Sequence, residues 1–130
     1  MSKPAGYHTI TPYLMIRGAA SAIDFYKTAF GATELSRQTG EDGRVHHAEI
    51  QIGDSQVMIT DESPQFPELR SVQAFGGSPM NMFLYVDDAD ALVKRATDAG
   101  AKLIMPVEDK PYGRSGGVKD PYGLDWWICS

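Results

Sequence analysis

Two spacings of apolar residues alternate along the chain and divide it into strands and helices. Residues 9–17 alternate between two faces, with Leu14 and Ile16 on one of them, which is typical of a strand. Residues 19–30 instead place apolar side chains at three- and four-residue steps, which predicts an amphipathic helix ended by Gly31. The chain therefore opens with a strand followed by a helix.

Three further strands are predicted in the first half of the chain, over residues 33–38, 44–52 and 55–61. Residues 39–43 and 53–54, which separate these strands, contain Gly and Asp and are typical of hairpin turns. The first half is thus predicted to form a βαβββ module, in which one helix accompanies four strands.

The same order of elements recurs in the second half. A strand over residues 81–86 precedes a helix that an Asp at 87 or 88 can cap and that ends before Gly100. Aligning Ile16 with Val86 superposes the two halves, and a repeat of this size indicates a duplicated half-domain. The strands that follow the second helix are predicted near residues 102–107, 114–119 and 124–129.

The modules are predicted to belong to one α+β domain over residues 1–130. The first module spans residues 9–62 and the second 81–130, and residues 63–80, rich in Pro and Gly, form a linker that doubles as a flap. Since each helix covers only one face of its sheet, the two modules would form a cupped, incomplete-barrel mixed sheet. An open cup of this kind is a typical ligand site.

The turn at residues 120–123, Asp-Pro-Tyr-Gly, leads into the last strand. Asp can bond its own backbone, Pro presets φ, and Gly accepts a left-handed conformation. In the strand that follows, Trp126 and Ile128 share one face while Trp127 lies on the other. Trp127 is therefore predicted to face the inside of the cup.

Composition and charge narrow the classes of partner. A length of 130 residues fits one domain, and a net charge of −5 argues against nucleic acid and anionic membranes as partners. The single cysteine, Cys129, excludes an internal disulfide framework and favours a cytoplasmic setting. The first seven residues carry no signal-like apolar run and are predicted to be a loose end.

The order of several short motifs points to a known family. The motifs are the helix 22–26 ending in Phe30-Gly31, His47-Ala48-Glu49, Gly53-Asp54-Ser55 and Asp120-Pro121-Tyr122-Gly123. Together they resemble the vicinal oxygen chelate superfamily, which contains glyoxalase I, bleomycin-resistance proteins, fosfomycin-resistance enzymes and extradiol dioxygenases. Residues 11–14 and 58–62 are similar to its PhnB-like branch.

The resemblance also implies where a metal would bind. In the metalloenzymes of the superfamily four strand positions bring His, Gln or Glu to one divalent metal. These positions correspond here to Thr11, Asn81, Met58 (or Thr60) and Trp127, none of which is a good metal ligand. We therefore expect no metal and no cofactor at the family's site.

Aromatic and methionine side chains are predicted to line the cup, where they suit a flat or hydrophobic ligand, although they could equally fill the space. Residues 112–117 are interpreted as a glycine-rich hairpin near the mouth of the second cup. The candidate ligand-binding residues are Thr11, Tyr13, Met15, Met58, Thr60, Asn81, Phe83, Tyr85, Tyr112, Arg114 and Trp127.

His47 and Glu49 are the candidate catalytic residues. Two residues apart on a strand, they share one face, and a carboxylate beside an imidazole can fix its tautomer for proton transfer. The alternative is a polar pair without catalytic function. His46 is predicted to point the other way, and His8 lies in the loose end.

Three classes of function remain open at this point. The first is a metal-independent homodimer that binds or sequesters a small hydrophobic or aromatic molecule, as the resemblance to bleomycin-resistance proteins implies. The second is a metal-dependent lyase, isomerase or dioxygenase that recruits its metal through His47, Glu49 and Glu62. The third is a structural interaction module without a ligand, which the aromatic cup face disfavours.

Overall fold

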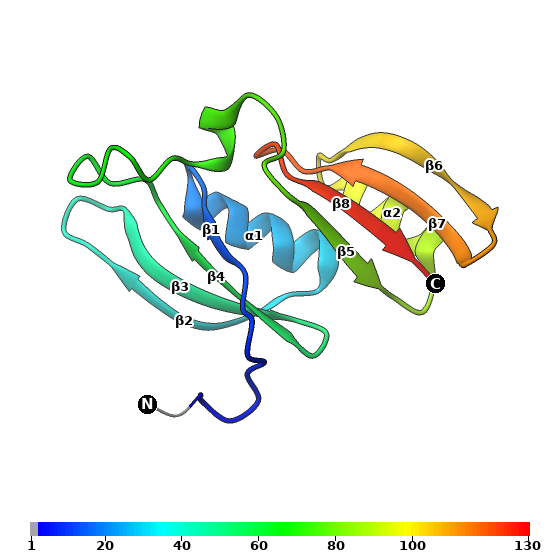
Figure 1. The fold of residues 1–130 in the computed structure, drawn as a ribbon, viewed down its shortest axis with the longest axis horizontal. Coiled ribbons are helices and arrows are strands. Elements are labelled where there is room, and N and C mark those ends of the chain that lie inside the picture. Colours follow the sequence, from blue (N-terminus) through cyan, green and yellow to red (C-terminus); the bar gives the residue numbers. More distant parts are fainter. Residues whose placement is uncertain (1–2) are drawn as a thin grey trace.

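The computed structural model of the protein describes residues 3–130 as two βαβββ modules (Figure 1). The predicted α+β fold and the order of its elements are confirmed. A short 3-10 helix, η1 (Val72–Phe75), lies in the segment between the modules. The first module contains β1 (Tyr13–Met15), α1 (Ala19–Phe30), β2 (Thr33–Thr39), β3 (Val45–Ile52) and β4 (Ser55–Thr60), and the second contains β5 (Asn81–Tyr85), α2 (Ala89–Asp98), β6 (Lys102–Lys110), β7 (Gly113–Lys119) and β8 (Asp125–Cys129).

The first strand is shorter than the sequence predicts, because it covers three residues rather than residues 9–17. Pro12 explains the late start, since it has no N–H to give to a ladder, although its carbonyl still accepts a hydrogen bond from Met58 N at 2.9 Å. Among residues 3–130 no helix is long and apolar enough to cross a membrane.

The two sheets have the same topology. Their strand orders are β1-β4-β3-β2 and β5-β8-β7-β6, and in each the first pair is parallel and the others antiparallel. One backbone bond is repeated as well, since Ile16 N donates to Thr60 O and Val86 N donates to Cys129 O, both at 2.9 Å. The repeat therefore extends to individual hydrogen bonds and agrees with the alignment of Ile16 with Val86.

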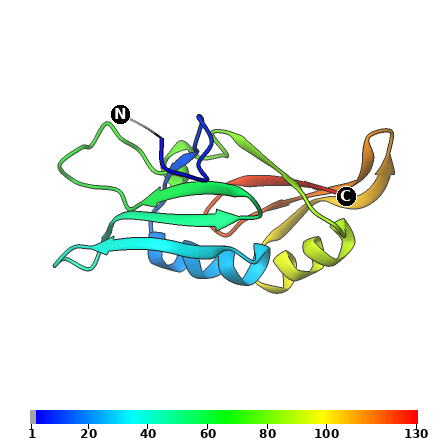
Figure 2. The same cartoon turned by 90° about the horizontal axis from the view of Figure 1, so that it is seen from below.

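Both helices lie on the same side of the two sheets and leave the opposite faces uncovered (Figure 2). The covered face of the first sheet is apolar, with Ala48, Ile50, Val57 and Ile59 buried against α1. In the second module Trp126 is buried on the covered side. No helix therefore separates these faces from a ligand or another molecule, although Tyr7 and residues 63–70 lie along part of the first sheet.

The two modules meet at a buried carboxylate, Asp120, which is only 3% exposed. Its Oδ2 accepts hydrogen bonds from the hydroxyl of Tyr26 on α1 at 2.5 Å and from Nε1 of Trp126 at 2.9 Å. Its Oδ1 accepts the backbone N–H groups of Tyr122 and Leu124 at 2.9 and 3.0 Å. Burial raises the pKa of Tyr26 well above its usual value, so the phenol remains a donor.

A second contact between the modules caps the C-terminal end of α1. The guanidinium of Arg95, on α2, donates to the carbonyls of Thr28 and Lys27 at 2.5 and 3.4 Å. Carbonyls in the last turn of a helix lack intrahelical partners and carry partial negative charge, so a cation there is stabilising. The helix of one module is thus capped by a side chain of the other.

Replacing Asp120 with Asn should destabilise the protein by about 3 kcal/mol, because the amide cannot accept all the bonds that the buried carboxylate accepts. Urea unfolding followed by circular dichroism measures the change. Asp98→Asn, which removes an exposed carboxylate paired with Lys94, is the matched control and should change stability by less than about 0.5 kcal/mol. Equal stabilities of the two variants would contradict the role assigned to Asp120.

Candidate functional site

The uncovered faces of the sheets carry most of the predicted site residues. We call the uncovered side of the first sheet the first face; it carries Tyr13, Met15, His47, Glu49, Met58 and Thr60. The uncovered side of the second sheet, the second face, carries Asn81, Phe83, Tyr85, Gly117 and Trp127.

Trp127 is held in a defined orientation on the second face. Its Nε1 donates to Oδ1 of Asn81 at 2.9 Å. Gly117 is its cross-strand partner on β7, and a Cβ added to Gly117 would lie 2.5 Å from Cε3 and Cζ3 of the indole. The six-membered ring of Trp127 therefore rests directly on the backbone of Gly117, and no other residue type allows this contact.

Gly117 therefore does not belong to the predicted hairpin turn at residues 112–117. The turn is confined to the residues around Tyr112, and Ser115 to Gly117 are internal to β7. The strand predicted over residues 114–119 is confirmed, and Gly116 and Gly117 belong to it rather than to the turn, because a strand glycine can also serve the close approach of a ring from the neighbouring strand.

Two further aromatic rings extend the second face along β5. Phe83 and Tyr85 lie with their ring centroids 5.0 Å apart, and they are 49% and 82% exposed. Rings at this separation pack against each other while leaving much of their surface to solvent. The second face is thus an aromatic surface suited to stacking.

On the first face, His47 and Glu49 form a hydrogen-bonded pair, with Nε2 of His47 2.9 Å from Oε2 of Glu49. The hydroxyl of Tyr7 donates to the other oxygen, Oε1. These two donors, Tyr7 first, hold the pKa of Glu49 below its usual value, and the bond to Glu49 raises the pKa of Tyr7. Glu49 is therefore an ionised carboxylate with both oxygens occupied.

The bond from Tyr7 corrects the prediction of a loose end at residue 7, while residues 1 and 2 of that prediction lie outside the described residues. His8 in the same segment also contacts the module, since its Nε2 lies 3.3 Å from Asp54 O. Residues 7 and 8 thus tie the N-terminal segment to the first sheet, although no strand or helix forms within residues 3–8.

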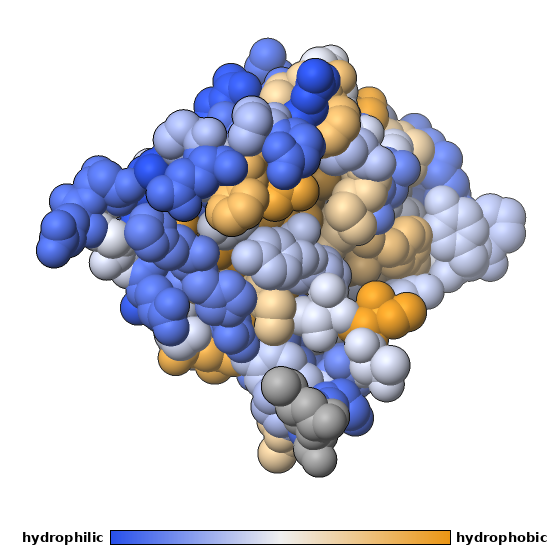
Figure 3. Space-filling view, turned by 60° about the vertical axis from the view of Figure 1, so that its left-hand side comes forward, coloured by the Kyte–Doolittle hydropathy of each residue, from blue (hydrophilic) through white to orange (hydrophobic). Residues whose placement is uncertain are grey.

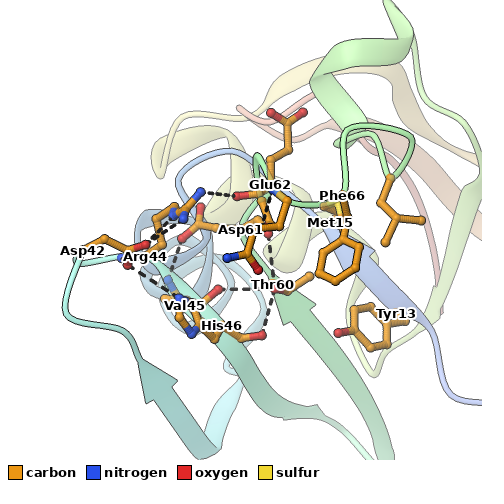
Figure 4. Close-up of a pocket in the computed structure, with 13 residues that line it drawn as sticks. Tyr13, Met15, Asp42, Arg44, Val45, His46, Thr60, Asp61, Glu62 and Phe66 are labelled. Carbon is orange, nitrogen blue, oxygen red and sulfur yellow. Dashed lines mark hydrogen bonds and ion pairs between the residues drawn. The ribbon is translucent and has the colours of Figure 1, made fainter.

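A pocket of about 400 Å³ opens beside Tyr13, beneath residues 63–70 (Figure 4). The rings of Tyr13 and Phe66 lie on one side of it, and charged groups that include Arg44 and Glu62 lie on the other. From outside, apolar side chains gather in a hollow flanked by hydrophilic residues on this side of the molecule (Figure 3). The pocket is suited to a ligand with one apolar and one polar end.

The charged wall of the pocket holds the base of the 63–70 loop. Glu62 accepts hydrogen bonds from Nε of Arg17 and from the backbone N of Ser71, both at 3.0 Å. Arg44 binds Asp42 with Nε to Oδ2 at 2.8 Å and donates to Glu62 O at 3.2 Å. Arg17 and Ser71 together lower the pKa of Glu62 to about 2.

Three predicted ligand-binding residues, Arg114, Thr11 and Tyr112, lie away from both faces, and a fourth, Thr60, has its hydroxyl bound within the first sheet. Arg114 projects from the covered side of β7, where it binds Asp90 at 2.5 Å and Asp109 at 3.1 Å. The hydroxyl of Thr60 donates to a backbone carbonyl of β3, at His46, 3.0 Å away. Thr11 lies just before β1, and Tyr112 is exposed in the β6–β7 turn.

These elements define a class of protein: a pair of βαβββ modules whose open sheet faces carry the candidate site. The family model of the Glyoxalase/Bleomycin resistance protein/Dioxygenase superfamily matches residues 7–128. The chain belongs to this superfamily, as its motifs indicated.

Several proteins share this sequence or fold. The chain is 42% identical over 120 residues to the uncharacterized protein Rv0887c of Mycobacterium tuberculosis, a match that covers 90% of this chain and 71% of the relative. The structure of the Arabidopsis thaliana protein At5g48480 superposes with a TM-score of 0.78 at 28% identity, over 95% of this chain and 99% of that one. TnmS3, an antibiotic binding protein from Streptomyces sp. CB03234, has the same fold, with a TM-score of 0.70 at 22% identity over 98% of each chain.

The side chains at the positions where the family's metalloenzymes bind a metal show whether this chain could bind one there. Nε1 of Trp127 is a hydrogen-bond donor already bound to Asn81, and the thioether of Met58 is a poor ligand for a hard divalent metal. Within residues 3–130 no three His, Cys, Asp or Glu side chains are grouped as metal ligands, and Glu62 is bound to Arg17 instead. The donor set at these positions does not fit a divalent metal.

The stability contributed by Glu62 should be lost in acid. Its folded-state pKa of about 2 lies below the usual 4.5, so the contribution is complete above pH 4.5 and disappears as the pH falls towards 2. Allowing for solvent screening of the exposed Arg17, we expect ionised Glu62 to contribute about 1 kcal/mol to the free energy of unfolding. Urea unfolding of the wild type and Glu62→Gln at pH 7, 4.5 and 3 measures it. A difference between the two that stays constant with pH would contradict the assignment.

Proposed function

We propose that the protein binds a planar aromatic or amphipathic small molecule, without a metal, in a cup that two copies of the chain build together. The observation that carries the proposal is the fixed indole of Trp127, bound to Asn81 and resting on Gly117. An aromatic ring fixed in this way can stack on a flat ligand without losing further side-chain freedom, which favours affinity.

The arrangement of the modules supports a second copy as the other half of the cup. Within one chain the modules contact each other through α1, α2 and Asp120, so neither open face meets the other. Tyr13, Phe83 and Tyr85 remain largely exposed on those faces. In a two-fold dimer the first face of one copy can meet the second face of its partner, and each cup then closes.

The relatives are in keeping with a binding function. The superfamily includes bleomycin-resistance proteins by its name, and TnmS3, which has the same fold, binds an antibiotic. The lone cysteine and the negative charge agree with a cytoplasmic protein whose partner is a small molecule. A metal-dependent lyase, isomerase or dioxygenase is the alternative, and the metal content of the purified protein distinguishes the two.

Trp127→Ala should weaken binding of 9-aminoacridine, a planar fluorescent probe, at least about tenfold, because the stacking surface is removed. Gly117→Ala should weaken it too, since the new Cβ displaces the indole without changing its chemistry. Fluorescence anisotropy of the probe measures both. Leu103→Ala, which shortens an exposed side chain on the other side of the same sheet, is the control. Unchanged affinity in Trp127→Ala would refute the proposed site.

The protein purified without chelator or affinity metal should contain no stoichiometric divalent metal and should have twice the chain mass of 14.2 kDa. Elemental analysis and native mass spectrometry measure the two quantities. Tyr85→Glu places a charge on the exposed second face and should give the monomer, because a buried unpaired carboxylate is costly. Stoichiometric zinc, manganese, nickel or iron would make the metalloenzyme the better proposal.

A further inference from the structure

Three titratable side chains form one hydrogen-bonded chain on the first face. Tyr7 donates to one oxygen of Glu49, and His47 contacts the other. The side chains of His47 and Glu49 are 27% and 22% exposed, so both remain accessible from solvent. The ring of Tyr13 lies beside them, with its centroid 5.9 Å from that of His47. A planar molecule bound against Tyr13 would therefore reach the imidazole.

The hydrogen bonds determine which nitrogen of His47 is basic. An ionised carboxylate can only accept hydrogen bonds, so the 2.9 Å contact with Glu49 requires the proton on Nε2. The neutral imidazole then carries its lone pair on Nδ1, and this atom has no hydrogen-bond partner within residues 3–130. Glu49 is in turn fixed by Tyr7. An imidazole oriented by a carboxylate, with its second nitrogen free, has the arrangement of a general base.

We propose that His47 is a general base that removes a proton from a planar carbon acid bound against Tyr13, with Glu49 and Tyr7 as positioning residues. The proton moves from substrate carbon to Nδ1, and the electron pair of the C–H bond stays with the substrate. Glu49 stabilises the imidazolium, which then releases the proton to water. This activity rests on the proposed aromatic-binding function, but it needs no metal.

The compound 5-nitrobenzisoxazole is a suitable probe, because it is planar and loses one proton in a single step. The C–H electrons form the nitrile as the N–O bond of the ring breaks, and the ring-opened product is a coloured cyano-nitrophenolate. His47→Ala should lower kcat/KM by about 100-fold, the usual contribution of a general base. The loss should appear in kcat, with KM retained. Lys94→Ala removes an exposed side chain of α2, on the opposite side of the sheets from His47, and is the control.

Two further variants separate the positioning roles. Glu49→Gln should lower kcat/KM about as much as His47→Ala, because the amide can donate to Nε2 and stabilise the tautomer with Nδ1 protonated. Tyr7→Phe removes one hydrogen bond to Glu49 and should cost about fivefold. The titratable groups around His47 are Glu49, Tyr13 and, through Glu49, Tyr7, while its cross-strand neighbour Gln38 is neutral.

Nitrogen NMR of the imidazole tests the geometry independently of any substrate. The wild type should have the proton of His47 on Nε2, and Glu49→Gln should have it on Nδ1. Equal kcat/KM values for the wild type and His47→Ala, with the probe bound, overturn the proposal, and so does a wild-type tautomer with Nδ1 protonated. If tryptophan quenching detects no binding of the probe, the aromatic-binding function and the proton transfer that rests on it are both overturned, whereas binding without a loss of kcat/KM in His47→Ala overturns the proton transfer alone.

Discussion

The buried carboxylate of Asp120 is the constraint on which the arrangement of this protein depends. It accepts hydrogen bonds from α1 of the first module, from Trp126 of β8, and from the backbone of its own turn. A buried charge is tolerated only when its hydrogen-bonding capacity is filled, so the two modules are fixed relative to each other by the need to supply these donors. The open faces of both sheets then lie on one side of the molecule (Figure 2).

The two modules share a backbone pattern but have different chemistry on their open faces. Met58 and Trp127 occupy equivalent positions, since they pair with Tyr13 and Phe83 on the first strand of each module. Their neighbours on the adjacent strand are Glu49 in one module and Gly117 in the other. One face is therefore polar and titratable and the other aromatic and flat. If two copies pair as proposed, each cup receives one face of each kind.

Much of this fold can be predicted from the chain itself. The periodicity of the sequence located both helices and most strands to within a few residues. Apolar side chains face one core only if they recur at every second residue in a strand, or at three- and four-residue steps in a helix. The Asp120 turn and the orientation of Trp127 followed from local turn chemistry and strand alternation. The bond between Tyr7 and Glu49 could not be found in this way, since it joins a segment without periodicity to a strand 42 residues away. The contact of Arg95 with α1, and the ring of Trp127 on Gly117, are likewise long-range and leave no local pattern.

The attachment of the N-terminal segment has a practical consequence for anyone who handles this protein. Tyr7 lies outside both modules, so a chain trimmed after residue 8 would keep every strand and helix. It would nevertheless lose the phenol that fixes Glu49, and with it part of the polar lining of the first face. Spectroscopic signs of correct folding would not reveal the loss. Trimmed and full-length preparations are therefore not interchangeable in ligand screens. A fusion partner at the N-terminus can disturb the same bond, so preparations with and without it should be compared.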